Sequence, residues 1–467
     1  MNFIPKYFTN KAIILFFALQ IAVGILYLSK LMPLRWYILG NIEVIGFFYF
    51  SHTLTKKWTQ FSAKRFITKL FVYALIIRII YVFFTYFFYT SMTGIPFEFE
   101  TGDALGYHNE AVWLKDLTLN GQFVSKYLPY VNGNYSDTGY PFYLSIIYML
   151  IDNSILIARI VKAILSAYTC VFIYKIAKNN FGEATGKIAG IIALLFPSFI
   201  YYCGIHVKET EMIFLVTLFI ERADFYLSVS TLNFKTLMWI LLLGISLFFF
   251  RTILGISAFF TLFTVLIFSA NKWVQSSKKI LVGFWIVLSL GLFLGGGMQN
   301  EISKYWEARG TNQAQSLKAR SEIAQGNKLA KYGTGIVFAP FMLVAPFPTM
   351  INIETQQNQM MIHGAYYVKN VLGFFVFIAL FFFYKEKIIK KHLILIAFLL
   401  VYLGILTLSK FAISERFHMP IYPVLICLAA FGVSRLNLKN SKGYTLYLVI
   451  LALVIVGWNW FKIAGRE

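Results

Sequence analysis

Long apolar segments recur along almost the entire chain and limit its possible folds more than any other feature. A membrane-spanning helix needs about 20 consecutive apolar residues, and about thirteen segments reach or approach that length. Only 13% of the 467 residues are charged, whereas soluble domains carry about 25%. The sequence therefore predicts an all-α polytopic membrane protein with these spans: 11–30, 35–54, 66–90, 154–178, 186–204, 209–229, 236–250, 253–270, 279–297, 366–384, 393–409, 418–436 and 444–461.

Basic residues between the apolar segments predict the orientation of the chain. The net charge of +22 would suggest nucleic acid as a partner of a soluble protein. Here the charges lie mostly in loops, so we expect contacts with membrane lipid and none with nucleic acid. Cytoplasmic loops are enriched in Lys and Arg, and residues 56–69 carry five of them. Alternation puts three further basic segments on that side and predicts a cytoplasmic N-terminus: 175–178, 272–279 and 385–391.

Two long segments, 91–153 and 298–365, are then expected on the outer side. The second contains three prolines within residues 340–348. Because proline interrupts a helix, this part is either a re-entrant or interfacial element or a loop packed on the bundle. The same segment carries basic residues that are either solvated or form a wall facing an anionic substrate: Lys304, Arg309, Lys318, Arg320, Lys328 and Lys331.

The first outer segment combines a carboxylate with an amphipathic pattern. Asp103 follows Gly102 at the outer mouth of the third apolar segment, and Tyr107 and His108 follow four and five residues later. A carboxylate at this place can take the proton of a hydroxyl that arrives from the aqueous side. Alternatively, Asp103 caps a helix. Apolar residues at helical spacing around Trp113 predict a short helix lying in the membrane interface.

Several motifs resemble those of the GT-C membrane glycosyltransferases, in particular bacterial relatives of protein O-mannosyltransferases and of the lipid A aminoarabinose transferase. In the first outer segment the resemblance rests on Gly102-Asp103-x-x-x-Tyr107 and on Gly139-Tyr140-Pro141-x-Tyr143. It extends over roughly residues 70–435 through three later stretches: 156–183, 196–211 and 415–423.

The resemblance implies a bundle of about 13 helices whose domains follow the predicted spans. A transmembrane hairpin is added at the N-terminus, and a GT-C-like catalytic module contains the first outer loop. An outer loop with the re-entrant or interfacial segment and a set of C-terminal helices follow. The corresponding ranges are 1–65, 66–300 (loop 91–153), 301–365 and 366–467.

The resemblance also implies an inverting transfer of a sugar from a polyprenyl-phosphate donor to an acceptor hydroxyl. The reaction would take place at the outer face of a bacterial cytoplasmic membrane, with Asp103 as the general base. The acceptor could be lipid A, another glycan or a protein. Such a site needs cations near the phosphate, and Arg251 and Arg416 are the candidates. Alternatively, Arg251 snorkels to the interface and Arg416 is a helix-end charge.

Further candidates for substrate binding lie within the quoted motifs: Tyr107, His108, Tyr140, Lys208 and Glu209. Glu209 alternatively caps the helix that it opens, because the positive end of a helix dipole favours carboxylates. No cofactor is predicted. A divalent metal ion would fit the carboxylates Asp103, Glu209 and Glu211, but it is not expected, since most of the resembling branch requires none.

Two other functions remain compatible with the sequence. A flippase for polyprenyl-linked glycans could use the same outer basic surface, although a transporter should carry charges inside the bundle from both sides. A glycan polymerase or ligase shares the chemistry but lacks the aspartate in the first outer loop. Essential arginines in residues 298–365, together with a dispensable Asp103, would favour the polymerase or ligase.

Overall fold

The chain folds into a bundle of helices. The computed structural model describes residues 3–131, 135–228, 234–268, 341–408, 415–436 and 440–464. Within these ranges it has no strand, and only Leu31 and Ile351 pair in an isolated β-bridge. The predicted span 279–297 and most of the second outer segment, including its six basic residues, lie outside these ranges. The all-α polytopic prediction is confirmed.

Seven described helical segments are long and apolar enough to cross a membrane, or eight if a bent pair counts as one span, so the described residues do not confirm the predicted count of about thirteen. They belong to α1 (Lys6–Leu26), α3 (Ala63–Thr93), α7 (Ile155–Phe181), α18 (His363–Lys385), α19 (Leu393–Leu408) with the turn before it, α20 (Glu415–His418) with α21 (Tyr422–Ser434), and α22 (Asn440–Ala464). The bent pair is α8 (Glu183–Leu195) and α9 (Pro197–Cys203).

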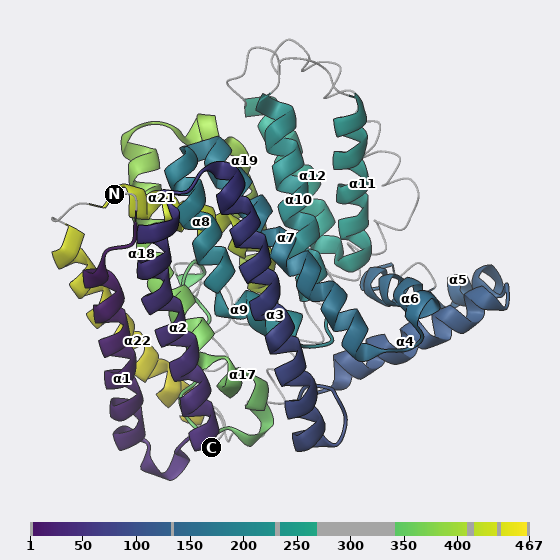
Figure 1. The fold of residues 1–467 in the computed structure, drawn as a ribbon, viewed down its shortest axis with the longest axis horizontal. Helices are drawn as coiled ribbons and strands as arrows, with labels where there is room; N and C mark the ends of the chain where they lie inside the picture. The colour runs from purple at the N-terminus through teal and green to yellow at the C-terminus, as the bar shows by residue number, and fades with distance from the viewer. Residues whose placement is uncertain are drawn as a thin grey trace.

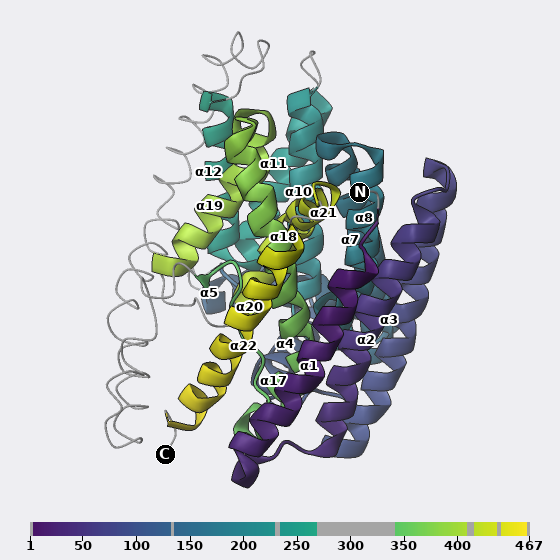
Figure 2. The same cartoon turned by 90° about the vertical axis from the view of Figure 1, so that its left-hand side faces the viewer.

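Five further helices complete the bundle or flank it. Three are apolar but shorter than a span: α6 (Gly139–Ile151), α11 (Phe234–Phe250) and α12 (Thr252–Phe268). Two have the length of a span but are less apolar: α2 (Leu34–Trp58) and α10 (Glu209–Ser228). Figure 1 shows α10, α11 and α12 together on one side of the bundle, and Figure 2 shows α1, α2 and α3 side by side on another.

The N-terminal hairpin of α1 and α2 is integrated into the bundle, with α2 packed against α8 and α18. Glu43 of α2 accepts a hydrogen bond from the backbone N–H of Ala365 at 3.0 Å, in the first turn of α18. The first N–H groups of a helix have no partner within the helix, and the helix dipole favours a negative charge there. Glu43 therefore fixes the start of α18, the helix that carries part of the site wall.

The break between α8 and α9 is held by a buried arginine. Pro197 has no N–H, so the carbonyl of Ala193 loses its partner in the helix, and the two helices meet at an angle of 48°. Arg78 of α3 donates hydrogen bonds to the carbonyls of Ala193 at 3.2 Å and Leu194 at 3.3 Å. It also donates to the Ser166 hydroxyl at 2.6 Å. The guanidinium thus replaces the donors that the break removes.

The prolines at 340–348 fall in a segment whose described part, from Phe341 onward, is irregular and mostly buried. Irregular backbone within a membrane protein is tolerated where protein satisfies its polar groups. Asn370 of α18 donates to the carbonyls of Val344 and Pro346 at 2.6 and 2.9 Å. Lys369 donates to the Ala345 carbonyl, and Asn459 of α22 donates to Pro348 at 3.1 Å. Two helices thereby hold this segment in place.

Three basic turns predicted to share one side of the membrane lie together in the structure. Lys187 at the start of α8 donates to the carbonyls of Thr59 and Phe61 at 3.1 and 2.6 Å, which joins the α7–α8 turn to the α2–α3 turn. Asn180 at the end of α7 bonds with His392 in the α18–α19 turn at 2.9 Å. The topology read from the charges is therefore consistent with the bundle.

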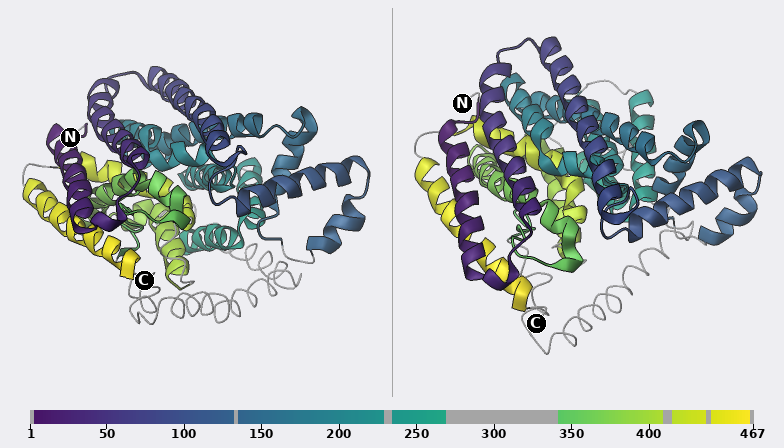
Figure 3. Two further views of the ribbon diagram at one scale, coloured as in Figure 1. Left: turned by 90° about the horizontal axis from the view of Figure 1, so that it is seen from below. Right: turned by 60° about the horizontal axis from the view of Figure 1, so that its bottom comes forward.

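The first outer segment forms α4 (Gly102–Leu119), α5 (Leu128–Val131) and α6, which extend sideways from the bundle (Figures 1 and 3). The helix expected around Trp113 is present but begins earlier, at Gly102, so that Asp103 lies in its first turn. Trp113 packs against Tyr127 and Tyr130 with ring centroids 5.9 and 5.0 Å apart. These aromatic contacts hold the outer end of α4 against the segment that returns to α6.

We predict that Arg78→Met lowers the free energy of unfolding by about 2–5 kcal/mol, because each buried carbonyl left without a donor costs about 1–3 kcal/mol. Thermal unfolding of the purified protein in detergent would measure the loss. Arg435→Met is the matched control, since Arg435 makes an exposed ion pair with Glu386 at 2.9 Å, and such pairs contribute about 0–1 kcal/mol. Equal unfolding temperatures for the two variants would contradict the role given to Arg78.

Candidate active site

Arg416 joins two of the predicted site residues, although all three are distant in sequence. Its Nε donates to Oε1 of Glu209 at 2.6 Å, and its Nη1 donates to Oδ2 of Asp103. The Glu209 side chain is completely buried at the start of α10, whereas 57% of the Asp103 side chain is exposed. One guanidinium thus connects a fixed carboxylate with a solvent-facing one. The capping alternative for Asp103 is not observed as a hydrogen bond: Thr101 precedes α4 as its N-cap, and no side chain caps it.

Arg251 lies on the other side of Glu209. It occupies the single residue between α11 and α12, and its Nη2 is 3.9 Å from Oε1 of Glu209. Its guanidinium stacks 4.3 Å from the ring centroid of Phe417, next to Arg416 in sequence. Two arginines from different helices therefore share one buried carboxylate, which holds them close together despite their like charge.

Lys208 adds a third cation beside the aromatic residues of the first outer segment. Its ammonium pairs with Asp137 and lies 5.6 Å from the ring centroid of Tyr107. Tyr107 in turn meets Tyr140 edge to face at 5.2 Å. Burial, followed by the neighbouring Arg251, lowers the pKa of Lys208 to about 7. The charge of Lys208 is therefore sensitive to pH near neutrality.

A buried lysine holds the loop that presents Lys208 and Glu209. Nζ of Lys162 on α7 donates to the carbonyl of Ile205 at 2.8 Å and to that of Val207. It lies 3.7 Å from Oε2 of Glu211, which is also buried. Lys162 was not among the site residues predicted from the sequence. It could have been recognised as a lysine in the middle of an apolar span, because a charge at that place is costly and often functional.

His108 belongs to a separate network behind the cations. Its Nδ1 is 2.8 Å from the hydroxyl of Tyr148, which is 3.2 Å from Nε2 of His206. The backbone N–H of His206 donates to Glu98 at 3.3 Å. Burial lowers the pKa of both histidines. The structure therefore brings Asp103, Lys208, Glu209, Arg251 and Arg416 together, places Tyr107 and Tyr140 at their edge, and leaves His108 in a supporting network.

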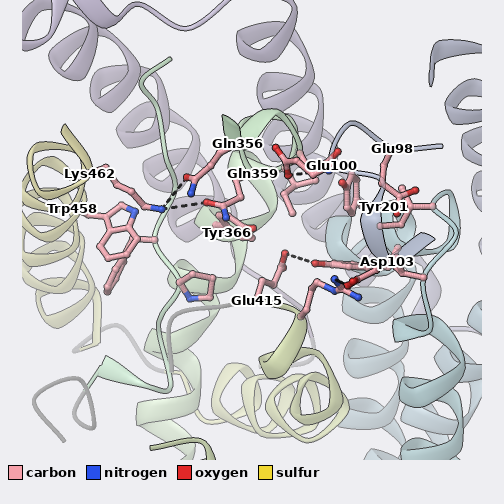
Figure 4. A pocket seen from close by; sticks show the side chains of 18 residues that line it. Glu98, Glu100, Asp103, Tyr201, Gln356, Gln359, Tyr366, Glu415, Trp458 and Lys462 are labelled. Atoms are coloured by element: carbon pink, nitrogen blue, oxygen red, sulfur yellow. Dashed lines mark hydrogen bonds and ion pairs between the residues drawn. The ribbon is translucent and has the colours of Figure 1, made fainter. Parts of the chain in front are cut away.

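Two cavities of different character lie near this group, and a third, of about 530 Å³, is lined by Asp103 and Tyr107. An apolar pocket of about 600 Å³ lies between α6, α10, α11 and the segment before α6, lined mainly by Phe123, Phe142, Tyr143, Phe214, Phe249 and Phe250. A more polar cavity of about 420 Å³ is lined at one end by Asp103 and Arg416 (Figure 4). Its other lining residues, including Glu415, Trp458 and Lys462, were missed in the sequence. Of these, only Glu415 adjoined a quoted candidate, Arg416.

Carboxylates and histidines do not gather in a metal-binding arrangement within the ranges that the structure describes. No group of three or more His, Cys, Asp or Glu side chains there could hold a metal ion. Of the three carboxylates considered for such a role, Asp103 and Glu209 are bridged by the guanidinium of Arg416, and Glu211 lies beside Lys162. An arginine thus supplies positive charge between the first two.

The chain is similar to one known family over part of its length. Residues 138–293, about a third of the chain, match the family model described as dolichyl-phosphate-mannose-protein mannosyltransferase. This family belongs to the GT-C glycosyltransferases. The resemblance to the GT-C glycosyltransferases is thereby confirmed. The match contains Lys162, Lys208, Glu209 and Arg251, and it supports a multi-pass membrane glycosyltransferase that uses a lipid-linked donor and an acceptor. No curated protein matches the chain.

The lowered pKa of Lys208 predicts that the protein binds a short isoprenyl phosphate less tightly as the pH rises. Below about pH 7 the free protein carries a charged Lys208. Above that pH, binding must first restore the proton, so affinity falls by up to about tenfold per pH unit. Calorimetric titration with geranyl phosphate from pH 6 to 9 would measure the trend.

In this titration the ratio of the wild-type affinity to the Lys208→Met affinity measures the effect of the Lys208 charge alone. Ionisation of the ligand affects both proteins equally and therefore cancels from the ratio. The ratio should be largest at pH 6 and approach one at pH 9. Lys115→Met is the control, since Lys115 pairs with Asp152 at the far end of α4, and it should retain the wild-type profile. A ratio independent of pH would exclude Lys208 as the titrating group.

Proposed function

We propose that the protein transfers a sugar, with inversion, from a polyprenyl-phosphate donor to an acceptor hydroxyl at the outer face of a bacterial cytoplasmic membrane. Asp103 is the general base in this proposal. The observation that carries it is the bridge from Asp103 through Arg416 to Glu209. It puts the candidate base directly beside cations suited to a phosphate, which is the arrangement that such a transfer requires.

The apolar pocket fits the polyprenyl chain of the donor. Phe250 lines this pocket and immediately precedes Arg251, and Thr138 lines it and immediately follows Asp137, the partner of Lys208. A lipid lying in the pocket would therefore have its phosphate end at the cations. Apolar surface for the chain and positive charge for the phosphate are the two features that a lipid-phosphate site combines.

The exposed carboxylates explain how the phosphate is accommodated. Arg416 and Lys208 are paired with Asp103 and Asp137, whose side chains are 57% and 53% exposed. These carboxylates can move into water at little cost, whereas Glu209 is buried and keeps the arginines in place. In the proposed complex the donor phosphate replaces Asp103 and Asp137 as the partner of Arg416 and Lys208.

Release of Asp103 from Arg416 makes its carboxylate available to the acceptor. Asp103 takes the proton of the acceptor hydroxyl while the acceptor oxygen forms a bond to the anomeric carbon. The bond from that carbon to the phosphate oxygen breaks on the opposite face, which inverts the configuration. Polyprenyl phosphate leaves with the electron pair, and Arg251, Arg416 and Lys208 stabilise its added charge.

The proposed orientation follows from the basic turns. The α2–α3, α7–α8 and α18–α19 turns share one end of the bundle, and positive residues favour the cytoplasmic side. The candidate site lies away from that end, at the break between α11 and α12 and the starts of α4 and α10. This supports a cytoplasmic N-terminus and an active site on the outer face.

We predict that Asp103→Asn lowers the rate of sugar transfer by about 10²–10⁴-fold, the range typical of losing a general base. The substitution keeps the size of the side chain, so the donor should still bind. Release of polyprenyl phosphate would be followed in lipid nanodiscs, with a membrane extract of the source cell supplying acceptor. Asp116→Asn is the matched control, because Asp116 is an exposed aspartate on the same helix.

Equal turnover by wild type and Asp103→Asn would remove Asp103 from the chemistry. Absence of turnover with every donor, combined with movement of a lipid-linked glycan across the bilayer, would establish the flippase instead. Loss of activity on substitution of arginines in residues 298–340, with Asp103 dispensable, would favour the polymerase or ligase.

A further inference from the structure

The polar cavity beside Asp103 extends away from the apolar pocket and shares no lining residue with it. It runs from Asp103 and Arg416 to Trp458 and Lys462 of α22, as Figure 4 shows. Its volume of about 420 Å³ falls within the range of about 300–1,000 Å³ for small-molecule sites. Arg416 lines this cavity, whereas the apolar pocket is lined by Phe250, the residue before Arg251. A donor whose lipid fills the apolar pocket therefore leaves this cavity for the other substrate.

Planar amides and carboxyl groups line the cavity in a fixed arrangement. Lys462 donates to the side-chain oxygens of Gln356 and Gln359 at 3.1 and 3.3 Å. Asn358 donates to Glu100 at 3.2 Å. These contacts join α22, the short helix α17 (Gln357–Met361) and the segment before α4. Polar groups prearranged by one another recognise a ligand without losing much conformational entropy.

Two buried polar atoms in the lining have no partner among the described residues. One is the indole Nε1 of Trp458, whose residue is 8% exposed, and the other is Oδ1 of Asn358. Buried polar groups are nearly always hydrogen-bonded in folded proteins. The first is a donor and the second an acceptor. A ligand that carries hydroxyl groups can satisfy both, since a hydroxyl donates and accepts.

The charge of the lining selects against anions. Four carboxyl groups face two cations, and one of those cations is already paired with one of the carboxyl groups; the residues are Glu98, Glu100, Asp103, Glu415, Arg416 and Lys462. A phosphate or carboxylate entering the cavity would meet this excess of acidic groups, and like charges at close range are destabilising. An uncharged polyol meets no such repulsion.

We propose that this cavity is the acceptor subsite and that it binds an uncharged sugar residue of a glycan. The inference rests on the proposed function, because it takes the acceptor hydroxyl to lie next to Asp103. A pyranose ring carries several hydroxyls, which match the amide and carboxyl groups of the lining and the N–H of Trp458. A serine or threonine would bring one hydroxyl to Asp103 and leave the Trp458 end unused.

The test compares acceptors and two tryptophan variants. Wild-type protein with donor in nanodiscs receives neutral methyl hexosides and disaccharides, a uronic-acid disaccharide, or a Ser/Thr peptide. We expect transfer to a neutral sugar. Trp458→Phe keeps an aromatic ring but removes the N–H, and should raise the KM for that sugar by about tenfold. Trp460→Phe, on the same helix with Trp460 51% exposed, should leave the KM unchanged.

Donor hydrolysis without acceptor separates this inference from the proposed function. If wild type releases polyprenyl phosphate into water but transfers only to the peptide or to the uronic-acid sugar, the acceptor inference is wrong and the transferase remains. An equal KM for Trp458→Phe and Trp460→Phe would also overturn it.

Saturation-transfer NMR with the same neutral sugars on Asp103→Asn gives a readout that does not need turnover. Binding that weakens in Asp103→Asn/Trp458→Phe would support the subsite even if no donor were consumed, in which case the proposed function alone would fail. Binding of none of the sugars would overturn the subsite.

Discussion

The site depends on buried cations that donate hydrogen bonds to backbone carbonyls left without a helical partner. Pro197 frees a carbonyl in the middle of the α8–α9 pair, and the guanidinium of Arg78 replaces the missing donor. Lys162 does the same for the loop between α9 and α10, where its ammonium binds the Ile205 and Val207 carbonyls. Together these two residues place the end of α9 and the start of α10. Since Lys208 and Glu209 stand at that start, the candidate site is positioned by backbone contacts made deeper in the bundle.

Glu209 then organises the functional groups around it. A buried carboxylate is unfavourable unless it is paired, and Glu209 is paired with Arg416 and lies near Arg251. These arginines come from α20 and from the α11–α12 break, so a single anion draws together three parts of the chain. Arg416, held by Glu209, also donates a hydrogen bond to Asp103 of α4. The packing of the bundle thus positions Glu209, Glu209 positions the two arginines, and Arg416 contacts the candidate base.

The sequence predicted the elements better than their partners. Apolar length identified the spans, and Arg251 stood out because a charge separated two apolar runs, as it does in the structure. The break at Pro197 could be foreseen from its missing N–H, but not that Arg78 repairs it, since the two residues are far apart in the chain. The sequence also offered no means of predicting that Arg416 bridges Asp103 and Glu209, or that Trp458 lines the cavity. Such contacts depend on how helices pack, and periodicity describes each helix alone.

The pairing of cations with exposed carboxylates also links the two substrates of the proposed reaction. Without donor, Arg416 holds Asp103, so the carboxylate is engaged by a guanidinium and is not free to meet an acceptor hydroxyl. The donor phosphate competes for the same guanidinium, so donor binding releases the base at the moment when an anomeric carbon is present. Because Glu209 remains bound, the arginine does not leave the site during this exchange. The ion pairs that keep the free site electrically balanced would thus limit deprotonation of an acceptor before a donor has arrived.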